Sequence, residues 1–239
     1  MSRDPLNIVI LTGAGVSAES GLATFRGPDG LWEGCRVEDV CTPEALERDP
    51  EMVHRFYDAR RAALLTVEPN AAHHALARLQ RAWRDEGRGE WLLVTQNVDD
   101  LHERGGAVDV LHMHGELLSA LCAACGDRHR WSGPMGDDPP CPSCASRRLR
   151  PDIVFFGEMP YHMDRIQMAL QHCDLFVSIG TSGAVYPAAG FVQTARHYGA
   201  QTLELNLDPS AGSIWFHASR MGPAGRLVPL WVDELLAVA

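Results

Sequence analysis

The stretch ILTGAGVSAESGLATFRG, residues 10–27, decides how the chain folds, because an apolar strand breaks there into a glycine-rich turn. Residues 13–18 (GAGVSA) match the pattern G-x-G-x-x-A, in which backbone N–H groups and a helix N-terminus hold a pyrophosphate. Such turns also occur as plain strand-to-helix connections, so the turn alone leaves both interpretations open. The pair Phe25 and Arg26 that follows is not required for phosphate binding.

Four short apolar runs have the character of buried strands, and segments with helical periodicity lie between several of them. This alternation predicts an α/β fold, a Rossmann-like parallel sheet covered by helices on both faces. The acidic residue expected about 20 positions after the glycine turn is missing, so we expect Asn206 and Asp208 to contact the ribose instead. The predicted strands are residues 7–12, 91–96, 174–180 and 201–206, and the predicted helices are residues 51–67, 70–85, 163–173, 187–198 and 232–238.

The composition is that of a globular protein, with 46% hydrophobic and 22% charged residues in 239. No apolar run approaches the roughly 20 residues of a membrane span, and the first residues lack a secretory signal. The formal net charge of −10 argues against non-specific nucleic-acid binding, which depends on Lys and Arg. We therefore expect a compact cytoplasmic monomer that binds neither membrane nor nucleic acid.

Four of the seven cysteines form two C-x2-C pairs separated by 15 residues, a spacing typical of zinc sites. Four thiolates complete the tetrahedral coordination of zinc, so the predicted metal is structural. A zinc ribbon can bind nucleic acid, but the acidic composition disfavours that role. We expect the other three cysteines to be structural. The predicted zinc ligands are Cys122, Cys125, Cys141 and Cys144.

Two segments interrupt the alternation of strands and helices, and we interpret them as insertions that form a smaller module. Residues 34–67 have helical periodicity without the strand of a βαβ unit, and residues 122–150 are rich in Cys, Pro, Gly and Asp. The predicted division gives three parts of a Rossmann-like domain (1–33, 69–118 and 152–239), a helical insertion (34–68) and a zinc-binding insertion (119–151).

Polar residues follow the predicted strands in residues 95–100 (TQNVDD) and 180–187 (GTSGAVYP). The carboxyl ends of parallel strands form the ligand crevice, so both segments should converge on the glycine turn. Taken singly, an Asn or Asp there is most simply a helix cap. In the extended segment VLHMHGE, His112 and His114 share one face, and either is a general base near neutral pH or a structural hydrogen-bond donor.

The motifs GAGVSAESG, QNVDDLH, HMHGE, RPDIVFFGE and GTSGAVYPAA, with the paired cysteines, resemble the sirtuins over essentially the whole chain. Sirtuins are NAD-dependent protein lysine deacylases, in which a Rossmann-like domain binds NAD, a smaller module carries one structural zinc ion, and the acyl-lysine enters between them. The resemblance implies that the acyl oxygen attacks the ribose and expels nicotinamide, and that free lysine and O-acyl-ADP-ribose are the other products.

The resemblance also assigns residues. It implies that His114 is the catalytic base, that Asn97 and Asp99 order the nicotinamide ribose and water, that Phe25 shields the ribose, and that Arg26 contacts the phosphates. The implied NAD contacts are Gly13, Ala14, Gly15, Ser17, Ala18, Glu19, Phe25, Arg26, Trp32, Gln96, Asn97, Val98, Asp99, Gly180, Thr181, Ser182, Asn206, Leu207, Asp208 and Ala224.

Tyr57 and Arg60 lie three residues apart and therefore on one helix face. They resemble the Y-x-x-R pair of class III sirtuins, which recognise succinyl- and malonyl-lysine. Without the resemblance, the Arg60–Arg61 pair is expected on a solvated helix face. Cys41 stands where close class III relatives tend to have alanine, so the ratio of succinyl to acetyl removal stays open. The substrate backbone is expected to pair as an added strand with Val154, Phe156, Gly157, Glu158 and Val185.

Three other functions fit part of these features. A regulatory module would bind NAD without releasing nicotinamide in response to a peptide. A protein ADP-ribosyltransferase would add mass to an acceptor protein. A zinc-ribbon nucleic-acid binder would need a basic face, which the acidic composition does not favour.

Overall fold

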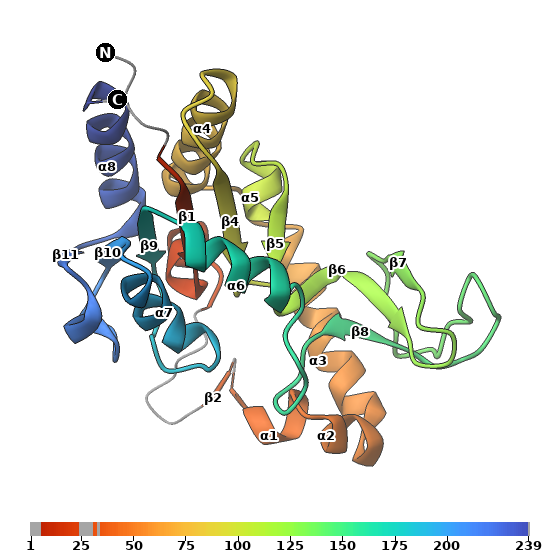
Figure 1. Cartoon of the computed structure of the whole chain (residues 1–239). Coiled ribbons are helices and arrows are strands. Elements are labelled where there is room, and N and C mark those ends of the chain that lie inside the picture. The colour runs from red at the N-terminus through yellow and green to blue at the C-terminus, as the bar shows by residue number, and fades with distance from the viewer. Residues whose placement is uncertain (1–5, 24–30, 33, 239) are drawn as a thin grey trace.

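The computed structural model describes residues 6–23, 31–32 and 34–238. At its centre lies a six-stranded sheet with the strand order β11-β10-β9-β1-β4-β5 (Figure 1). All neighbouring strands in it are parallel, and the chain leaves β1 first towards β4 and later towards β9, which makes a switch point at β1. The strands are β1 (Ile8–Thr12), β4 (Trp91–Thr95), β5 (Val110–His112), β9 (Leu175–Ile179), β10 (Gln201–Asn206) and β11 (Ala218–Met221).

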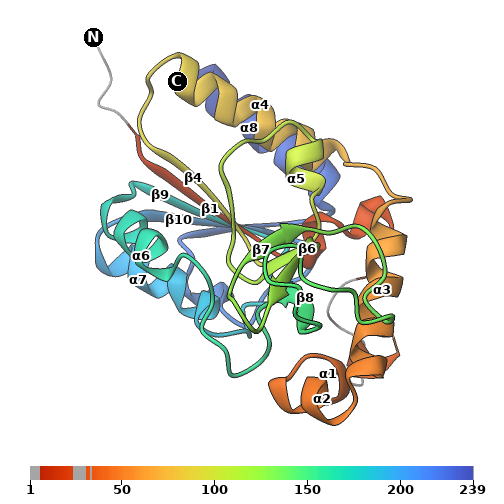
Figure 2. The same ribbon diagram turned by 90° about the vertical axis from the view of Figure 1, so that its right-hand side faces the viewer.

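Helices cover both faces of this sheet, as predicted for an α/β fold. Figure 2 shows α4 and α8 on one face and α6 and α7 on the other. The β1 side chains alternate between the two layers: Ile8 and Ile10 belong to the cluster that includes α4 and α8, and Val9 and Leu11 to the cluster that includes α6 and α7. The helices are α4 (Ala71–Asp85), α6 (Met163–His172), α7 (Phe191–His197) and α8 (Ala224–Val238).

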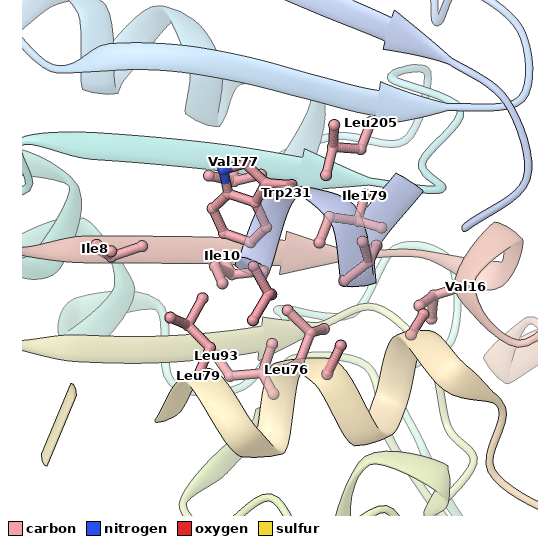
Figure 3. Packing of buried hydrophobic residues seen from close by; sticks show 14 of the residues in the cluster. Ile8, Ile10, Val16, Leu76, Leu79, Leu93, Val177, Ile179, Leu205 and Trp231 are labelled. Atoms are coloured by element: carbon pink, nitrogen blue, oxygen red, sulfur yellow. The ribbon is translucent and has the colours of Figure 1, made fainter. Parts of the chain in front are cut away.

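The larger buried cluster joins the sheet to α4 and α8. In Figure 3, Ile10 and Val177 from the strands belong to one cluster with Leu76 of α4 and Trp231 of α8. Because strands such as β1 are buried on both faces, their residues are apolar except at the end. That is the reason why the sequence predicted them correctly.

The inserted segments form a smaller module beside the sheet (Figure 1). Its helix α3 contacts β6 and β8 of a three-stranded antiparallel sheet with the order β7-β6-β8. The segment predicted as wholly helical, residues 34–67, begins instead with the short strand β3, which pairs antiparallel with β2 just before it. The elements are β2 (Leu31–Trp32), β3 (Cys35–Arg36), α1 (Val37–Val40), α2 (Pro43–Arg48), α3 (Pro50–Leu64), β6 (Gly115–Cys122), β7 (Arg128–Arg130) and β8 (Leu149–Ile153).

Local sequence fixes where the main helices begin. Asp49 accepts a hydrogen bond from the Met52 amide at 2.9 Å and caps α3, whose first residue is a proline. Asn70 caps α4 in the same way, and His73 returns a bond to the Asn70 amide as a capping box. These caps place the starts of both helices within one residue of the predicted positions.

The last helix is longer than predicted, because α8 begins at Ala224 rather than at residue 232. Pro229 lies within it, and a proline normally argues against a helix interior. The side chains of Val228 and Trp231 are buried in the cluster that includes α4, and this packing offsets the lost backbone hydrogen bond. Among the helices of the described residues, none has both the length and the apolar character of a membrane span.

Candidate functional site

The glycine turn is held against the loop after β9. Gly13 donates its amide to the Ile179 carbonyl at 3.0 Å, and Gly15 donates to the Gly180 carbonyl at 2.9 Å. A Cβ atom on Gly15 would lie 2.7 Å from the Gly180 Cα, so the close approach of the two backbones requires glycine. Two short 3-10 helices, η1 (Ala14–Val16) and η2 (Ala18–Ser20), follow the turn instead of the α-helix of the usual pattern.

One cavity of about 490 Å³ runs from this turn, across the carboxyl ends of the strands, to the smaller module. Apart from the zinc ligands, every predicted site residue with a described side chain lines this cavity except Tyr57. Phe25, Arg26 and the side chain of Trp32 lie outside the description. The predicted residues in the lining are Gly13, Ala14, Gly15, Ser17, Ala18, Glu19, Arg60, Gln96, Asn97, Val98, Asp99, His114, Val154, Phe156, Gly157, Glu158, Gly180, Thr181, Ser182, Val185, Asn206, Leu207, Asp208 and Ala224.

Ser17 links the loops after β1 and β4. Its hydroxyl donates to Asp99 Oδ2 at 3.0 Å and accepts from Asn97 Nδ2 at 3.1 Å. The other carboxylate oxygen of Asp99 accepts the Leu101 amide, so both oxygens are held. Burial raises the pKa of Asp99, and these hydrogen bonds oppose the rise. The arrangement fixes an amide and a carboxylate side by side at the floor of the cavity.

Sequence reasoning missed His73, which supports this network from α4. Its Nδ1 accepts the Asn70 amide at 3.1 Å, so the proton of the neutral ring is on Nε2, which lies 3.4 Å from the Ser17 hydroxyl. Burial lowers the pKa of His73 to about 4, which keeps the ring neutral. The sequence does contain an N-x-x-H pattern typical of a helix start, which accounts for the bond between His73 and Asn70. That pattern does not reveal the contact between His73 and Ser17.

The two histidines of the HMH segment have different environments. His114 lines the cavity, and its Nδ1 lies 3.1 Å from the Gln96 carbonyl. A carbonyl only accepts, so Nδ1 carries the proton and Nε2 is the basic nitrogen. Burial lowers the pKa of His114 below its ordinary 6.5, and the side chain is therefore neutral at pH 7.

His112 is committed to structural bonds instead. Its ring bridges the Asn97 carbonyl at 3.1 Å and Glu103 Oε1 at 2.8 Å. Burial opposes the charged form, but the hydrogen bond and the charge of Glu103 raise the pKa of His112 overall. Since it does not line the cavity, the geometry favours His114 as the base.

At the far end of the cavity, the side chains of the two adjacent arginines of α3 have different surroundings. Arg60 lines the cavity, with its guanidinium carbon 4.4 Å from the centre of the Phe56 ring. Arg61 is fully buried and donates to the Leu117 carbonyl at 2.8 Å and to Asp58 at 2.6 Å. The expectation of a solvated helix face for this pair is therefore wrong, because Arg61 is buried and Arg60 lines the cavity.

Tyr57 lies behind the wall of the cavity. Its ring stacks on Phe155 with 5.9 Å between centroids, and its hydroxyl hydrogen-bonds the Cys41 thiol. Burial raises the pKa of both groups, so both are neutral at pH 7. Cys41, Leu117 and Phe155 line the cavity next to it, and of these the sequence indicated Cys41 alone.

The four paired cysteines meet at one point of the smaller module. Their sulfur atoms all lie within 4.8 Å of one another, with 3.7 Å between Cys122 and Cys144 and 3.8 Å between Cys125 and Cys141. Four sulfurs about 2.3 Å from one zinc ion are about 3.8 Å apart in a tetrahedron. The cluster therefore fits zinc, with no coordination position left for a substrate. The side chains lie at the end of β6 and away from the cavity lining.

A parallel sheet with a switch point, a glycine turn against the next strand and a cavity bounded by an inserted module together define a Rossmann-like nucleotide-binding protein. Residues 13–187 match the model of the Sir2 family. This chain belongs to the Sir2 family, as the sirtuin motifs predicted.

Relatives and solved structures agree with this assignment. The chain is 54% identical over 241 residues to the NAD-dependent protein deacylase SIR2rp3 of Trypanosoma brucei brucei, covering 99% of this chain and 97% of that protein. It is 53% identical over 232 residues to the NAD-dependent protein deacylase of Escherichia coli strain K12, covering 96% and 82%. A crystal structure of a Sir2 homolog–NAD complex superposes with a TM-score of 0.86 at 37% identity, covering 97% of this chain and 90% of that one.

Proposed function

We propose that this chain is an NAD-dependent protein lysine deacylase that converts acyl-lysine into lysine, nicotinamide and O-acyl-ADP-ribose. The observation that carries the proposal is a single cavity that joins the glycine turn, the Ser17–Asn97–Asp99 network and the neutral imidazole of His114. The relatives named above are deacylases by name, and a further solved relative is a Sir2–p53 peptide–NAD+ complex, with a TM-score of 0.81, 28% identity and coverage of 97% and 94%.

The glycine turn fits the NAD pyrophosphate, because Gly13, Ala14 and Gly15 line the cavity with little side-chain bulk. A Cβ at Gly13 or Gly15 would collide with the loop at Gly180, which lines the same cavity. NAD supplies a ribose carbon from which nicotinamide leaves when the acyl oxygen attacks. Asn97 and Asp99 orient the nicotinamide ribose and water. His114 removes a ribose hydroxyl proton at Nε2, while the Gln96 carbonyl holds its Nδ1–H.

Arg60 supports removal of acidic acyl groups. Its guanidinium, in the cavity wall, can donate two charge-assisted hydrogen bonds to the distal carboxylate of succinyl- or malonyl-lysine. Tyr57 contributes by shaping the wall through Phe155 and Cys41. We propose succinyl- and malonyl-lysine as preferred substrates, with acetyl-lysine as a further one. Substrate proteins would pair their backbone with residues 154–157, which favours loose sequence selectivity.

We also propose a cytoplasmic monomer that binds neither nucleic acid nor membrane, and the net charge of −10 supports the absence of nucleic-acid binding. We propose the division into three Rossmann-like parts and two insertions as well, and the order of the helices and strands along the chain supports it. One structural zinc ion at the four cysteines would hold the ends of β6 and β8 together.

Mass spectrometry of NAD reactions with matched acetyl-lysine and succinyl-lysine peptides tests the proposal. We expect loss of the acyl group with formation of O-acyl-ADP-ribose, and neither with His114→Ala. Nicotinamide release without deacylation, mass added to a protein, or NAD binding without any product would each refute the deacylase.

A further inference from the structure

Arg150, in β8, holds the segment that faces the cavity. Its two terminal nitrogens donate to the two carboxylate oxygens of Glu158 at 2.6 and 3.0 Å, and one of them also donates to the Ile153 carbonyl at 2.8 Å. The Arg150 side chain is only 12% exposed. Although burial favours the neutral form of Glu158, the bonds from Arg150 lower the pKa of this carboxyl overall. The ion pair is therefore fully formed at pH 7.

The pair fixes the turn between its two members. Glu158 Oε2 also accepts the Phe155 amide at 2.7 Å, and the Arg150 guanidinium lies 4.1 Å from the centre of the Phe155 ring. Within the same segment, the Val154 amide donates to the His114 carbonyl. Both carboxylate oxygens of Glu158 are thus bound by Arg150 and Phe155. Glu158 can therefore hold this segment in place without contacting the substrate.

The same turn reaches the acyl end of the cavity. The Phe156 amide donates to the Cys41 carbonyl at 3.0 Å, and the Phe155 ring stacks on Tyr57. Tyr57 is on α3, one turn before Arg60. A movement of Arg150 would therefore displace both the segment proposed to pair with the substrate backbone and the wall behind the acyl group.

We propose that Arg150 is a positioning residue for the acyl-lysine substrate, acting through Glu158 and Phe155 on residues 153–157. The proposal rests on the deacylase function. A lysine cannot replace it, because an ammonium group lacks the planar fork that binds both carboxylate oxygens and lies flat on the ring. NAD binds at the opposite end of the cavity, so its binding should not depend on this pair.

Steady-state kinetics with acyl-lysine peptide and NAD varied separately tests this role. We expect Arg150→Lys and Arg150→Met to raise the KM for the peptide about tenfold or more, the effect of losing one charge-assisted hydrogen bond. The KM for NAD should stay near the wild-type value. Arg148→Met is the matched control, since its exposed side chain is two residues earlier on the same segment, and it should change neither constant.

Two further measurements separate positioning from folding. Thermal midpoints and zinc content of each variant identify a folding defect, and the Arg150→Met/Glu158→Gln double variant should be no worse for peptide KM than Arg150→Met alone, because both changes break one interaction. Equal rises in both KM values, or an unchanged peptide KM in folded Arg150→Met, would overturn the role of Arg150. An inactive wild type would refute the deacylase function instead.

A second observation is independent of this pair. The chain has 21 arginines and no lysine, although lysine is among the commonest residues of soluble proteins. Arginine supplies the positive charge of exposed ion pairs, such as Arg55–Glu51, and of buried ones, such as Arg61–Asp58. The side chains therefore offer no amine to an acylating agent.

Chemical acylation of lysine needs that amine. The neutral amine attacks the carbonyl carbon of an acyl thioester, the C–N bond forms, the C–S bond breaks, and the thiol leaves with the proton. An arginine stays protonated and has no free lone pair for this reaction. We infer, on the basis of the proposed function, that this chain resists the modification that it removes and is not a substrate for its own copies.

Incubation with a succinyl thioester, followed by peptide mass mapping and a desuccinylation assay, tests this inference. The wild type should gain succinyl groups in amide linkage only at its α-amino group and keep its activity. The matched variant Arg226→Lys, at an exposed position near the start of α8, should gain one further group, which active wild type removes with NAD. Side-chain adducts on the wild type that lower its activity would overturn the inference, whereas an inactive untreated wild type would refute the deacylase.

Discussion

Arg60→Met should lower kcat/KM for succinyl-lysine and leave kcat/KM for acetyl-lysine unchanged. Arg60 lines the cavity and rests on the Phe56 ring, so its guanidinium is already oriented when the substrate enters. A hydrogen bond to a charged group contributes about 1.5–3 kcal/mol, so the loss of one lowers kcat/KM about 10- to 150-fold. Methionine keeps the length and apolar stem of the side chain, and the acetyl substrate has no carboxylate to lose.

The assay compares kcat/KM for succinyl-lysine and acetyl-lysine versions of one peptide, with saturating NAD. Arg55→Met is the control, because Arg55 is on the same helix with a 65% exposed side chain and pairs only with Glu51 among the contacts found. It should leave both activities unchanged. The reasoning is refuted if Arg60→Met leaves desuccinylation intact, or if it lowers both activities to the same extent.

Three more outcomes follow from the structure. Arg61→Met should lower the free energy of unfolding by about 3 kcal/mol in chemical denaturation, because it leaves Asp58 without its buried partner; a change below the error of the measurement would contradict this. The acid limb of kcat/KM should lie below pH 6.5, since the lowered pKa of His114 keeps the base neutral until the pH falls through that value; a limb above pH 7 would exclude it. Removal of zinc by a chelator should lower the thermal midpoint and be reversed by added zinc, and an unchanged midpoint would mean that the cysteines hold no structural metal.

The main sheet could be predicted because its signal is local. The strands β1, β4 and β9 are buried on both faces and therefore consist mostly of apolar residues, whereas in β10 (QTLELN) two buried leucines alternate with polar residues. β11 has no such signal, because its four residues are exposed and its position depends on pairing with β10. The early start of α8 depends likewise on packing against α4, which no local pattern records.

The site was predictable where a backbone position or a metal dictates the residue type. The glycines and the cysteines belong to that class, and short motifs identify them. Tyr57 is different: its helical spacing places it near Arg60, but whether its hydroxyl faces the cavity or Cys41 is decided by the packing of Phe155. His73 was missed for a related reason, since its second contact joins α4 to a loop 56 residues away.

Under the proposed function, the two arginines of α3 explain how the smaller module would select the acyl group without disturbing NAD. Successive residues of a helix point about 100° apart, so Arg60 and Arg61 face different neighbours. Arg61 fixes α3 to the Leu117 carbonyl of β6, the strand that ends at Cys122, and the Leu117 side chain lines the cavity. The orientation of Arg60 therefore depends on the same strand that carries the zinc cluster, while the glycine turn and the Ser17 network depend on the main sheet. Substitutions in the module can change which acyl group fits, because the NAD half of the cavity has a separate support.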